Sequence, residues 1–579
     1  MDMVNIKINN MPYQVPANIT VLEAAREAGI DIPTLCYLKD INEIGACRMC
    51  MVEIKGARSL MAACVYPVNE GMEVFTNTPK VQKSRKMTLE MILSVHNRKC
   101  LSCPRNQNCE LQNLCADMGI DNENRFSGDM PKATYDNSTA YLVRNNSKCI
   151  LCRRCVAACS NQVVSVIGAN NRGFDTEIGC AFEQPLNDVS CVACGQCIIS
   201  CPTGALVEKS NIQETLDAIN DPDKFVVVQT APAVRAALGE EFGMPIGTNV
   251  EGKMVAALRR LGFDKVFDTT FGADMTIMEE ATEFIDRVQN NGVLPMITSC
   301  SPGWIKFCEH HYPDLIGNLS SCKSPQQMTG ALLKTWYAKK ENIDPTKIVS
   351  VAVMPCTAKK FEIGRANEDA AGVPDVDIVL TTREMADMVR LAQLSFTRLP
   401  DEEFDEAMGV STGAGIIFGA TGGVMEAALR TAADLLSGED LEALDYKEVR
   451  GIGVFKEAVY NVAGMEVKVA VVSGLNNANK LLEKVRAGEA DYHFIEVMCC
   501  PGGCVNGGGQ PIQNAKVRSF EDIKGMRASA LYNEDTIKTI RKSHQNPILK
   551  QCYEEFLGEP GGHLAHEILH TSFVKRVKL

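Results

Sequence analysis

The chain has 579 residues, of which 45% are hydrophobic and 23% are charged, so it is long enough to form several globular domains. Its formal net charge of −13 argues against a nucleic-acid partner, and no uninterrupted apolar run reaches the roughly 18 residues of a membrane helix. The first residues, MDMVNIKI, lack the basic and apolar segments of a signal peptide. The chain has 25 cysteines, and we expect a cytoplasmic protein that uses cysteines as metal ligands rather than in disulfides.

Residues 1–78 are predicted to form a small β-grasp domain. Residues 3–8 alternate between apolar and polar side chains, as a half-buried strand does, and residues 51–56 resume this alternation. Between these strands, Thr20 and Glu23 form a capping box that begins a helix. The segment also carries four cysteines whose spacing is similar to that of plant-type ferredoxins but wider at its start: Cys36, Cys47, Cys50 and Cys64. We expect these thiolates to hold a [2Fe–2S] cluster, and a structural zinc site is the alternative.

Residues 79–120 are predicted to form a second iron–sulfur domain. A helical stretch at 80–95 leads into one histidine and three cysteines: His96, Cys100, Cys103 and Cys109. On spacing alone this set could bind zinc, because three cysteines and one histidine are also a zinc ligand set. The neighbouring cysteine-rich segments favour a [4Fe–4S] cluster, and a histidine ligand should raise its reduction potential relative to four thiolates.

Residues 138–209 are predicted to form a two-[4Fe–4S] ferredoxin domain. Two C-x2-C-x2-C-x3-C runs begin at residues 149 and 191. In bacterial ferredoxins the fourth cysteine of each run ligates the other cluster. We therefore expect one cluster on Cys149, Cys152, Cys155 and Cys201, and the other on Cys191, Cys194, Cys197 and Cys159. The chain thus has room for four accessory clusters in series, which is the arrangement of an electron relay.

Residues 210–579 are predicted to form a large α/β catalytic domain. Four apolar runs are typical of buried parallel strands: residues 225–230, 347–355, 376–382 and 467–474. Helical stretches such as 252–262 are interleaved with them. The glycine-rich segment 418–424 lacks the spacing of a dinucleotide fingerprint and predicts a turn into a helix. The sequence contains no flavin or NAD fingerprint. The predicted fold class is therefore multidomain, with a β-grasp, a small helical, an α+β ferredoxin and a large α/β domain.

Three cysteine-bearing segments of this last domain are the candidate catalytic motifs: TSCSPGW at 298–304, MPCTAK at 354–359 with Glu362, and EVMCCPGGC at 496–504. Each follows an apolar stretch, so their cysteines can converge at strand ends. The glycines of the last segment let the backbone approach a bulky inorganic group closely. In this order, behind the accessory ligands, the motifs resemble the three signature motifs of [FeFe]-hydrogenases, and the resemblance covers essentially the whole chain.

The resemblance implies an H-cluster, a [4Fe–4S] cubane joined by one thiolate to a diiron subsite that bears CO, cyanide and a bridging azadithiolate. By position, Cys356, Cys500 and Cys504 would ligate the cubane, with Cys504 as the bridge. Lys359 would hydrogen-bond a cyanide, and its charge suits an anionic ligand in a dry pocket. Further residues match family positions that line the subsite, although core packing is the alternative for the two methionines: Pro232, Ser324, Gln326, Met354, Phe418 and Met498.

The same resemblance implies a proton path from a relay cysteine through two glutamates to the surface. Glu280, Ser320 and Glu283 fall where this path would run, with Arg287 at its mouth. The two glutamates stand at positions i and i+3, so they share one face of a helix. Acidic groups with intervening serines can pass protons at hydrogen-bond distance. A solvated acidic helix is the alternative interpretation.

The first motif departs from the family pattern of two adjacent cysteines, in which the first relays protons and the second ligates the cubane. Here Cys300 is followed by Ser301, while Cys499 adds a thiol directly before Cys500. Either Ser301 ligates through oxygen and Cys300 relays protons, or the loop shifts, Cys300 ligates and Cys499 takes over the relay. Because thiolate is the softer ligand, we favour Cys300 as the cubane ligand.

Several other cysteines and histidines carry no clear ligand pattern. Five cysteines are predicted to be buried thiols: Cys115, Cys180, Cys308, Cys322 and Cys552. His563, His566 and His570 line one helical stripe near the end of the sequence. A zinc site is conceivable there, and a surface or contact patch is the favoured interpretation.

Taken together, the motifs predict an [FeFe]-hydrogenase that interconverts H2 with protons and electrons in the cytoplasm of an anaerobe. Electrons would pass through the accessory clusters to ferredoxin and, by electron bifurcation, to NAD(P)-binding flavin and iron–sulfur partner subunits. We favour such a complex because the chain has no flavin site and departs from the motifs of simple monomers. Maturation proteins would insert the diiron unit. The alternatives are a stand-alone ferredoxin-dependent hydrogenase, an H2 sensor, and an iron–sulfur scaffold.

Overall fold

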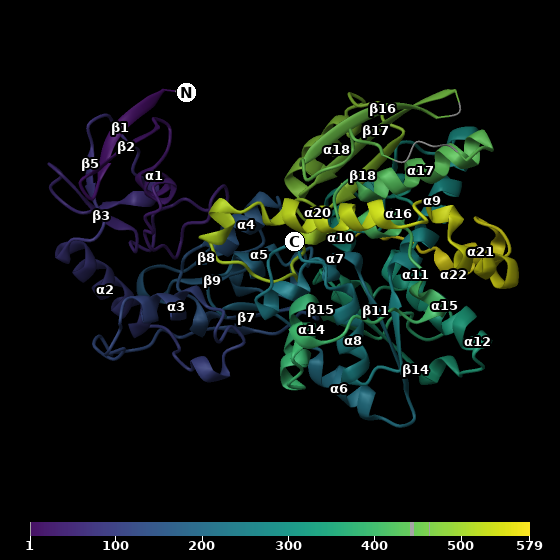
Figure 1. Ribbon diagram of the computed structural model, residues 1–579, viewed down its shortest axis with the longest axis horizontal. Coiled ribbons are helices and arrows are strands. Elements are labelled where there is room, and N and C mark those ends of the chain that lie inside the picture. The colour runs from purple at the N-terminus through teal and green to yellow at the C-terminus, as the bar shows by residue number, and fades with distance from the viewer. Residues whose placement is uncertain (1, 441–444, 463, 579) are drawn as a thin grey trace.

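The computed structural model describes residues 2–440, 445–462 and 464–578. A lobe built from residues 2–120 stands beside a larger body that begins near residue 210, and the segment between them joins the two (Figure 1). Among the described residues, no helix combines the length and apolar character needed to cross a membrane. The arrangement is multidomain, as the sequence predicts.

The N-terminal lobe contains a mixed sheet in the order β2-β1-β5-β3-β4. Strand β1 is antiparallel to β2 and parallel to β5, and the strand bounds are Met3–Ile8 (β1), Met11–Pro16 (β2), Met51–Ile54 (β3), Met61–Ala62 (β4) and Glu73–Phe75 (β5). Helix α1 (Val21–Glu27) packs on this sheet, with Val21 and Leu22 fully buried. The predicted capping box is confirmed, since Thr20 accepts from the Glu23 amide and Glu23 accepts from the Thr20 amide.

Two helices complete the lobe, and a small sheet with two further helices joins it to the body. Helix α2 (Pro79–Ser94) confirms the predicted helix at 80–95, and α3 (Glu110–Asp117) follows the next cysteines. Beyond it, β6, β7 and β10 form a three-stranded sheet, with bounds Tyr135–Asp136, Leu142–Asn145 and Leu206–Glu208. Helices α4 (Arg154–Asn161) and α5 (Gln196–Ser200) pack on each other, and each contains cysteines of one ferredoxin-type run.

The first sheet of the body is wholly parallel, in the order β12-β11-β14-β15, with bounds Lys265–Asp268, Phe225–Thr230, Ile348–Met354 and Ile378–Thr381. Val226 and Val228 of β11 pack toward α8 (Glu251–Leu261) and α14 (Thr382–Leu391). Val227 packs in the opposite cluster, with residues of α9 (Thr270–Gln289) and α11 (Pro325–Leu332). Burial on both faces explains why these strands are continuously apolar.

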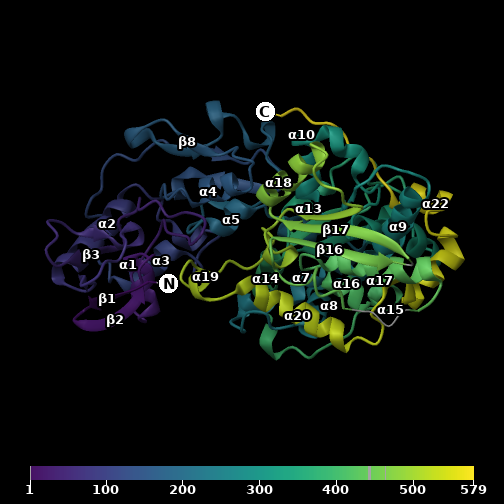
Figure 2. The same cartoon turned by 90° about the horizontal axis from the view of Figure 1, so that it is seen from above.

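The second sheet of the body has the order β13-β18-β17-β16, with bounds Met296–Ile297, Phe494–Met498, Met465–Ser473 and Phe455–Val462. The first three strands are parallel, and β16 is an antiparallel edge strand (Figure 2). Helices α10 (Pro302–His311) and α18 (Leu475–Arg486) cover one face, and α9 and α17 (Gly423–Ser437) cover the other. Helix α9 therefore lies between the two sheets, where most of its length is buried.

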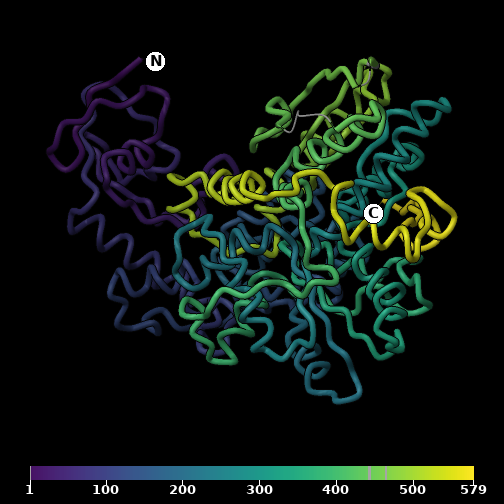
Figure 3. Tube along the Cα trace, turned by 45° about the vertical axis from the view of Figure 1, so that its right-hand side comes forward, coloured from purple at the N-terminus to yellow at the C-terminus, as the bar shows by residue number. Residues whose placement is uncertain are grey.

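The C-terminal segment runs back along the body toward the N-terminal lobe and then returns (Figure 3). Before α20 (Ile523–Ile537), the short helix α19 (Val517–Phe520) lies next to the lobe, and Ser519 accepts a 2.8 Å hydrogen bond from Arg26. Helices α21 (Pro547–Cys552) and α22 (His563–Leu569) then pack against the α9 and α11 side of the body. This return places His570 close to the glutamates of α9.

Candidate functional site

The four cysteines of the N-terminal lobe lie together in one loop region. The Cys36 amide donates to the Cys47 sulfur at 3.4 Å, and hydrogen bonds from the Cys47 and Cys64 thiols lower the pKa of Cys36. Cys64 also hydrogen-bonds with Cys50. Three of the four side chains are buried, so this is a compact, largely dry group of soft ligands. Its chemistry fits an iron–sulfur cluster.

His96 follows α2 and has the properties of a neutral metal ligand. It is buried, and its Nδ1 atom has no hydrogen-bond partner among the described residues. Burial, together with Lys148 and Arg98, lowers the pKa of His96 to about 4, so the imidazole is uncharged at neutral pH. Cys103 lies against the next domain, because a Cβ atom on Gly204 would stand 2.6 Å from its sulfur. A buried imidazole with a free lone pair fits the predicted site of one histidine and three cysteines.

The two ferredoxin-type runs form two separate cavities, each lined by four cysteines. One is lined by Cys149, Cys152, Cys155 and Cys201. The other is lined by Cys159, Cys191, Cys194 and Cys197. In both cavities the fourth cysteine comes from the other run. The structure therefore brings together the same two sets of four cysteines that the sequence pattern predicts.

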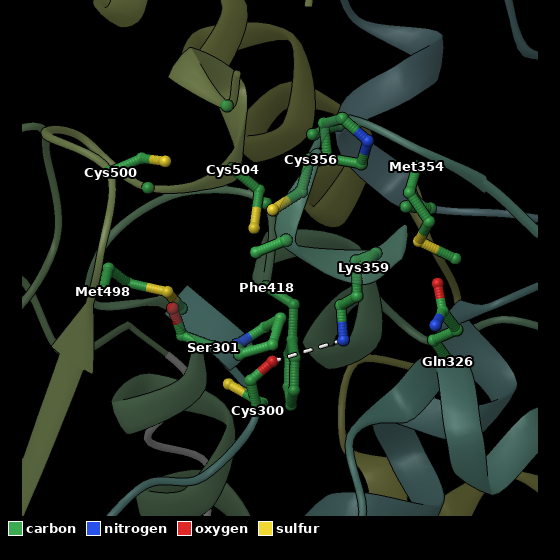
Figure 4. A pocket seen from close by; sticks show the side chains of 18 of the residues that line it. Cys300, Ser301, Gln326, Met354, Cys356, Lys359, Phe418, Met498, Cys500 and Cys504 are labelled. Atoms are coloured by element: carbon green, nitrogen blue, oxygen red, sulfur yellow. Dashed lines mark hydrogen bonds between the residues drawn. The ribbon is translucent and has the colours of Figure 1, made fainter. Parts of the chain in front are cut away.

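The catalytic motifs surround a third cavity inside the body (Figure 4). It lies where strands of both sheets end: β11 leads to Pro232, β14 to Cys356, β13 to Cys300 and β18 to Cys499. Carboxyl ends of parallel strands are the usual place for a site in an open α/β sheet. The structure places nearly all the predicted subsite residues in its wall: Pro232, Cys300, Gln326, Met354, Cys356, Lys359, Phe418, Met498, Cys499, Cys500 and Cys504.

Cys356, Cys500 and Cys504 form one side of this cavity. Burial and the nearby charges of Cys500 and Cys504 raise the pKa of Cys356. The loop that follows packs tightly on the same wall, since a Cβ atom on Gly507 would stand 2.1 Å from the Pro355 carbonyl oxygen. Only glycine fits there, and this close approach keeps Cys504 on the same side of the cavity as Cys356.

Lys359 lies on α13 (Ala358–Glu362) and presents its ammonium group at the cavity wall. Its Nζ atom donates to Ser324 Oγ at 2.7 Å, to Glu362 Oε2 at 2.9 Å and to the Cys300 carbonyl at 3.4 Å. Ser324 and Gln326 also donate to Glu362, at 2.9 and 3.1 Å. Ser324 therefore acts on the cavity through Lys359. The buried Glu362, to which the sequence pattern assigns no role, holds the cation in place.

The predicted proton-path residues form a continuous row on and beside α9. Glu280 is fully buried, and the Ser320 hydroxyl and the Ser299 amide lie near its carboxylate, although neither oxygen makes a hydrogen bond of normal geometry with a described residue. Burial and the charge of Glu283 raise the pKa of Glu280 to about 8. Ser320 Oγ donates to Glu283 at 3.1 Å, and Arg287 donates to Glu283 at 2.6 Å. The alternative of a solvated acidic helix is wrong, because Glu280 is inaccessible to solvent.

Cys300 lies between the cavity and this row of residues. Cys300 is half-buried, and burial, followed by the charge of Glu280, raises the pKa of its thiol well above that of a free cysteine. Ser301 Oγ accepts a 3.2 Å hydrogen bond from the Cys499 amide. The two segments that carry the unusual residues are thus in direct contact.

Three contacts near the site could not be predicted from local sequence patterns. Cys194, from an accessory-cluster cavity, also lines the catalytic cavity. His570 Nε2 donates to the Glu279 carboxylate at 3.0 Å, and its Nδ1 atom hydrogen-bonds with Ser321 Oγ at 2.8 Å, so the end of the predicted histidine stripe is a buried contact. Cys322 lies 3.9 Å from Glu283. Each contact joins segments far apart in the chain, which a local pattern does not reveal.

Comparison with known proteins agrees with this order of sites. Five family models match: a 2Fe-2S iron-sulfur cluster binding domain (1–79), the iron-sulfur binding region of NADH-ubiquinone oxidoreductase-G (85–124), a 4Fe-4S dicluster domain (148–205), the C-terminal domain of the iron only hydrogenase large subunit (224–508) and the iron hydrogenase small subunit (521–576). The last two cover the catalytic cavity and the segment that contributes His570.

Two full-length relatives and one solved structure are similar to the chain. The NADP-reducing hydrogenase subunit HndD of Solidesulfovibrio fructosivorans is 48% identical over the whole of both chains. Iron hydrogenase 1 of Clostridium pasteurianum is 45% identical over 99% of this chain and all of its own. The apo [FeFe]-hydrogenase HydA1 of Chlamydomonas reinhardtii is 42% identical, with a TM-score of 0.56, over 63% of this chain and 99% of its own. The chain belongs to the [FeFe]-hydrogenase family of iron-only, iron–sulfur oxidoreductases.

Proposed function

We propose that this chain is the catalytic subunit of a cytoplasmic, NAD(P)-linked [FeFe]-hydrogenase complex that oxidises H2 reversibly. The proposal depends on one observation. Cys194 lines both the catalytic cavity and an accessory-cluster cavity, and the catalytic cavity also lies beside the buried Glu280. Electrons and protons therefore have separate routes to one place. The relationship to an NADP-reducing hydrogenase subunit supports the link to a partner that binds NAD(P).

The donor set of the catalytic cavity fits an H-cluster. Cys356, Cys500 and Cys504 would hold the cubane, with Cys504 as the bridge, and Lys359 would bind an anionic cyanide ligand. When bound, the H-cluster supplies the diiron centre that cleaves H2 heterolytically and the azadithiolate amine that takes up the proton. Thioether and apolar side chains would line the diiron side and exclude water: Pro232, Met354, Phe418 and Met498.

The residues beside the cavity would move the proton to solvent. The Cys300 thiol lies near Glu280, whose carboxyl is mostly protonated at neutral pH because its pKa is raised to about 8. Ser320 connects this region to Glu283 by a 3.1 Å hydrogen bond, and Arg287 holds Glu283 at the less buried end. A neutral carboxyl next to an ionised one can donate a proton and then be reprotonated from outside.

The accessory sites would carry electrons away along a branched route. From Cys194 the route would pass between the two ferredoxin-type cavities, whose ligands come from both runs. The cavity lined by Cys149, Cys152, Cys155 and Cys201 has two neighbours. Asn42 Nδ2 donates to the carbonyls of Cys36 and Cys152, at 2.8 and 3.1 Å, and so joins it to the [2Fe–2S] loop. Arg105 donates to the Cys201 carbonyl at 3.2 Å and joins it to the His96 site. Two exits from one cluster suit two electron acceptors.

We assign the four domains as first predicted: a β-grasp [2Fe–2S] domain (1–78), a [4Fe–4S] domain with one histidine and three cysteine ligands (79–120), a two-[4Fe–4S] ferredoxin domain (138–209) and an H-cluster domain (210–579). The mixed sheet around β1 and the paired helices α4 and α5 support the first and third assignments. The cofactors would be one [2Fe–2S] cluster, three accessory [4Fe–4S] clusters and the H-cluster. Maturation proteins would be required to load the diiron unit.

The test is H2-dependent reduction of NAD(P)⁺ and of ferredoxin by the matured chain, measured with and without its partner subunits. We expect NAD(P)⁺ reduction only in the complex, because the sequence carries no flavin or NAD fingerprint. Reduction of ferredoxin by the isolated chain, unaffected by the partners, would instead indicate a stand-alone hydrogenase. Absence of any H2 turnover after maturation would indicate a sensor or a scaffold.

A further inference from the structure

The catalytic cavity offers more candidates for the fourth cubane ligand than the cluster needs. A [4Fe–4S] cluster is normally held by four thiolates. Cys356, Cys500 and Cys504 supply three of these. Three other groups line the same cavity: Cys300, Ser301 and Cys499. The positions of their side chains distinguish them.

Cys300 lies away from the other thiols. Figure 4 shows it on the opposite side of the cavity from Cys356, Cys500 and Cys504. Its carbonyl oxygen accepts the Lys359 hydrogen bond at 3.4 Å, and its thiol is within reach of the Glu280 charge. This position suits a group that exchanges protons with the glutamate row.

Ser301 is poorly suited to iron. Its hydroxyl oxygen already accepts the 3.2 Å hydrogen bond from the Cys499 amide. To bind iron it would have to lose its proton and act as a hard alkoxide, whereas cubane iron prefers soft sulfur. Its observed contact instead fixes the backbone of the neighbouring segment at Cys499.

Cys499 places its thiol next to one of the cubane ligands, Cys500. It is buried, with 4% exposure, and its thiol hydrogen-bonds with the thiols of Cys500 and Cys194. Its sulfur also presses on the first motif, because a Cβ atom on Gly303 would stand 2.7 Å from it. The Cys499 thiol thus lies against residues 301–303, the segment that contains Ser301.

We propose that Cys499 is the fourth thiolate ligand of the cubane, with Ser301 as a positioning residue and Cys300 left free to relay protons. The proposal rests on the proposed function, because it assumes that the cavity holds this cluster. On binding iron, the Cys499 thiol gives up its proton. Since Cys194 contacts Cys499, a ligand of the cubane would touch a ligand of the nearest ferredoxin-type cluster. That contact is the electron exit.

The experiment uses the full chain produced without maturation proteins, so that the cubane and accessory clusters are present and the diiron unit is not. Iron content and Mössbauer and EPR spectra are compared for C499A, S301A and C300A, with C552A as a control for loss of a buried thiol outside the cavity. We expect C499A alone to lose about four iron atoms per chain, together with the cubane spectrum. S301A, C300A and C552A should keep the cubane.

A double variant separates loss of a ligand from loss of folding. S301C/C499A moves the thiol across the 3.2 Å contact, and we expect it to regain the cubane that C499A loses. The proposal is overturned if C499A keeps its full iron content and an unchanged spectrum, or if S301A or C300A loses the cubane. A failure of the proposed function would appear separately, as absence of H2 turnover in the matured unsubstituted chain.

Discussion

Replacing Glu280 with glutamine keeps the size of the side chain and removes its exchangeable proton. Glu280 is fully buried on α9, and burial and the charge of Glu283 raise its pKa to about 8. At pH 7 the carboxyl is therefore protonated in roughly nine of ten molecules and can donate. Because a positioned acid or base contributes on the order of 10²–10⁴ in rate, we expect E280Q to lower H2 turnover by that factor.

The rates of H2 evolution and H2 oxidation should change with pH in opposite directions. H2 evolution needs Glu280 to donate, so its rate should fall as pH rises through about 8 and the carboxyl ionises. H2 oxidation needs the same group to accept, so its rate should rise through that pH. Both rates are measured with a dye as electron partner, and the inflection should vanish in E280Q.

Asp286 provides a matched control, because it is an exposed carboxylate on the same helix. D286N should leave both rates unchanged. The infrared spectrum of E280Q should match that of the unsubstituted protein, which excludes a failure of cluster loading. The reasoning is refuted if E280Q turns over at the unsubstituted rate, or if it slows while keeping an inflection near pH 8.

Three further substitutions test other parts of the site. K359Q leaves Glu362 buried without its cation, which should lower the free energy of unfolding by about 3–5 kcal/mol, and it removes the group that would bind cyanide. Infrared bands of the diiron unit should therefore weaken. Bands of normal intensity would contradict this role of Lys359. H96C replaces a neutral ligand by a thiolate and should lower the potential of one accessory cluster in an EPR redox titration, and an unchanged potential would exclude His96 as a ligand. C159A should remove the cluster of the Cys191 run and spare that of the Cys149 run, and the reverse loss would disprove the crossed ligation.

Local patterns predicted much of this fold. The capping box at Thr20, the helix before His96 and the parallel apolar strands around Val227 are confirmed, because each depends on residues close together in the chain. The run of apolar residues at 467–474 is β17, which pairs in parallel with β18. Its antiparallel partner β16 on the sheet edge was not predicted, since an edge strand lacks a continuous apolar run.

The parts of the site that belong to sequence motifs were predictable. The two sets of four cysteines follow from spacing, and the structure brings each set together. The contacts of Cys499 with Cys194 and of His570 with Glu279 were not predictable, because they join segments separated by hundreds of residues. The choice among Cys300, Ser301 and Cys499 likewise depends on which side of the cavity each one occupies, and spacing does not specify that.

The most direct test of the proposed activity is infrared spectroscopy of the matured, anaerobic chain in the region where bound CO and cyanide absorb. We expect sharp CO and cyanide bands that shift when H2 is admitted, because the cavity beside Lys359 is suited to a cyanide-bearing diiron unit. Absence of these bands in protein that holds its full complement of cubane and accessory iron would contradict an H-cluster in this cavity.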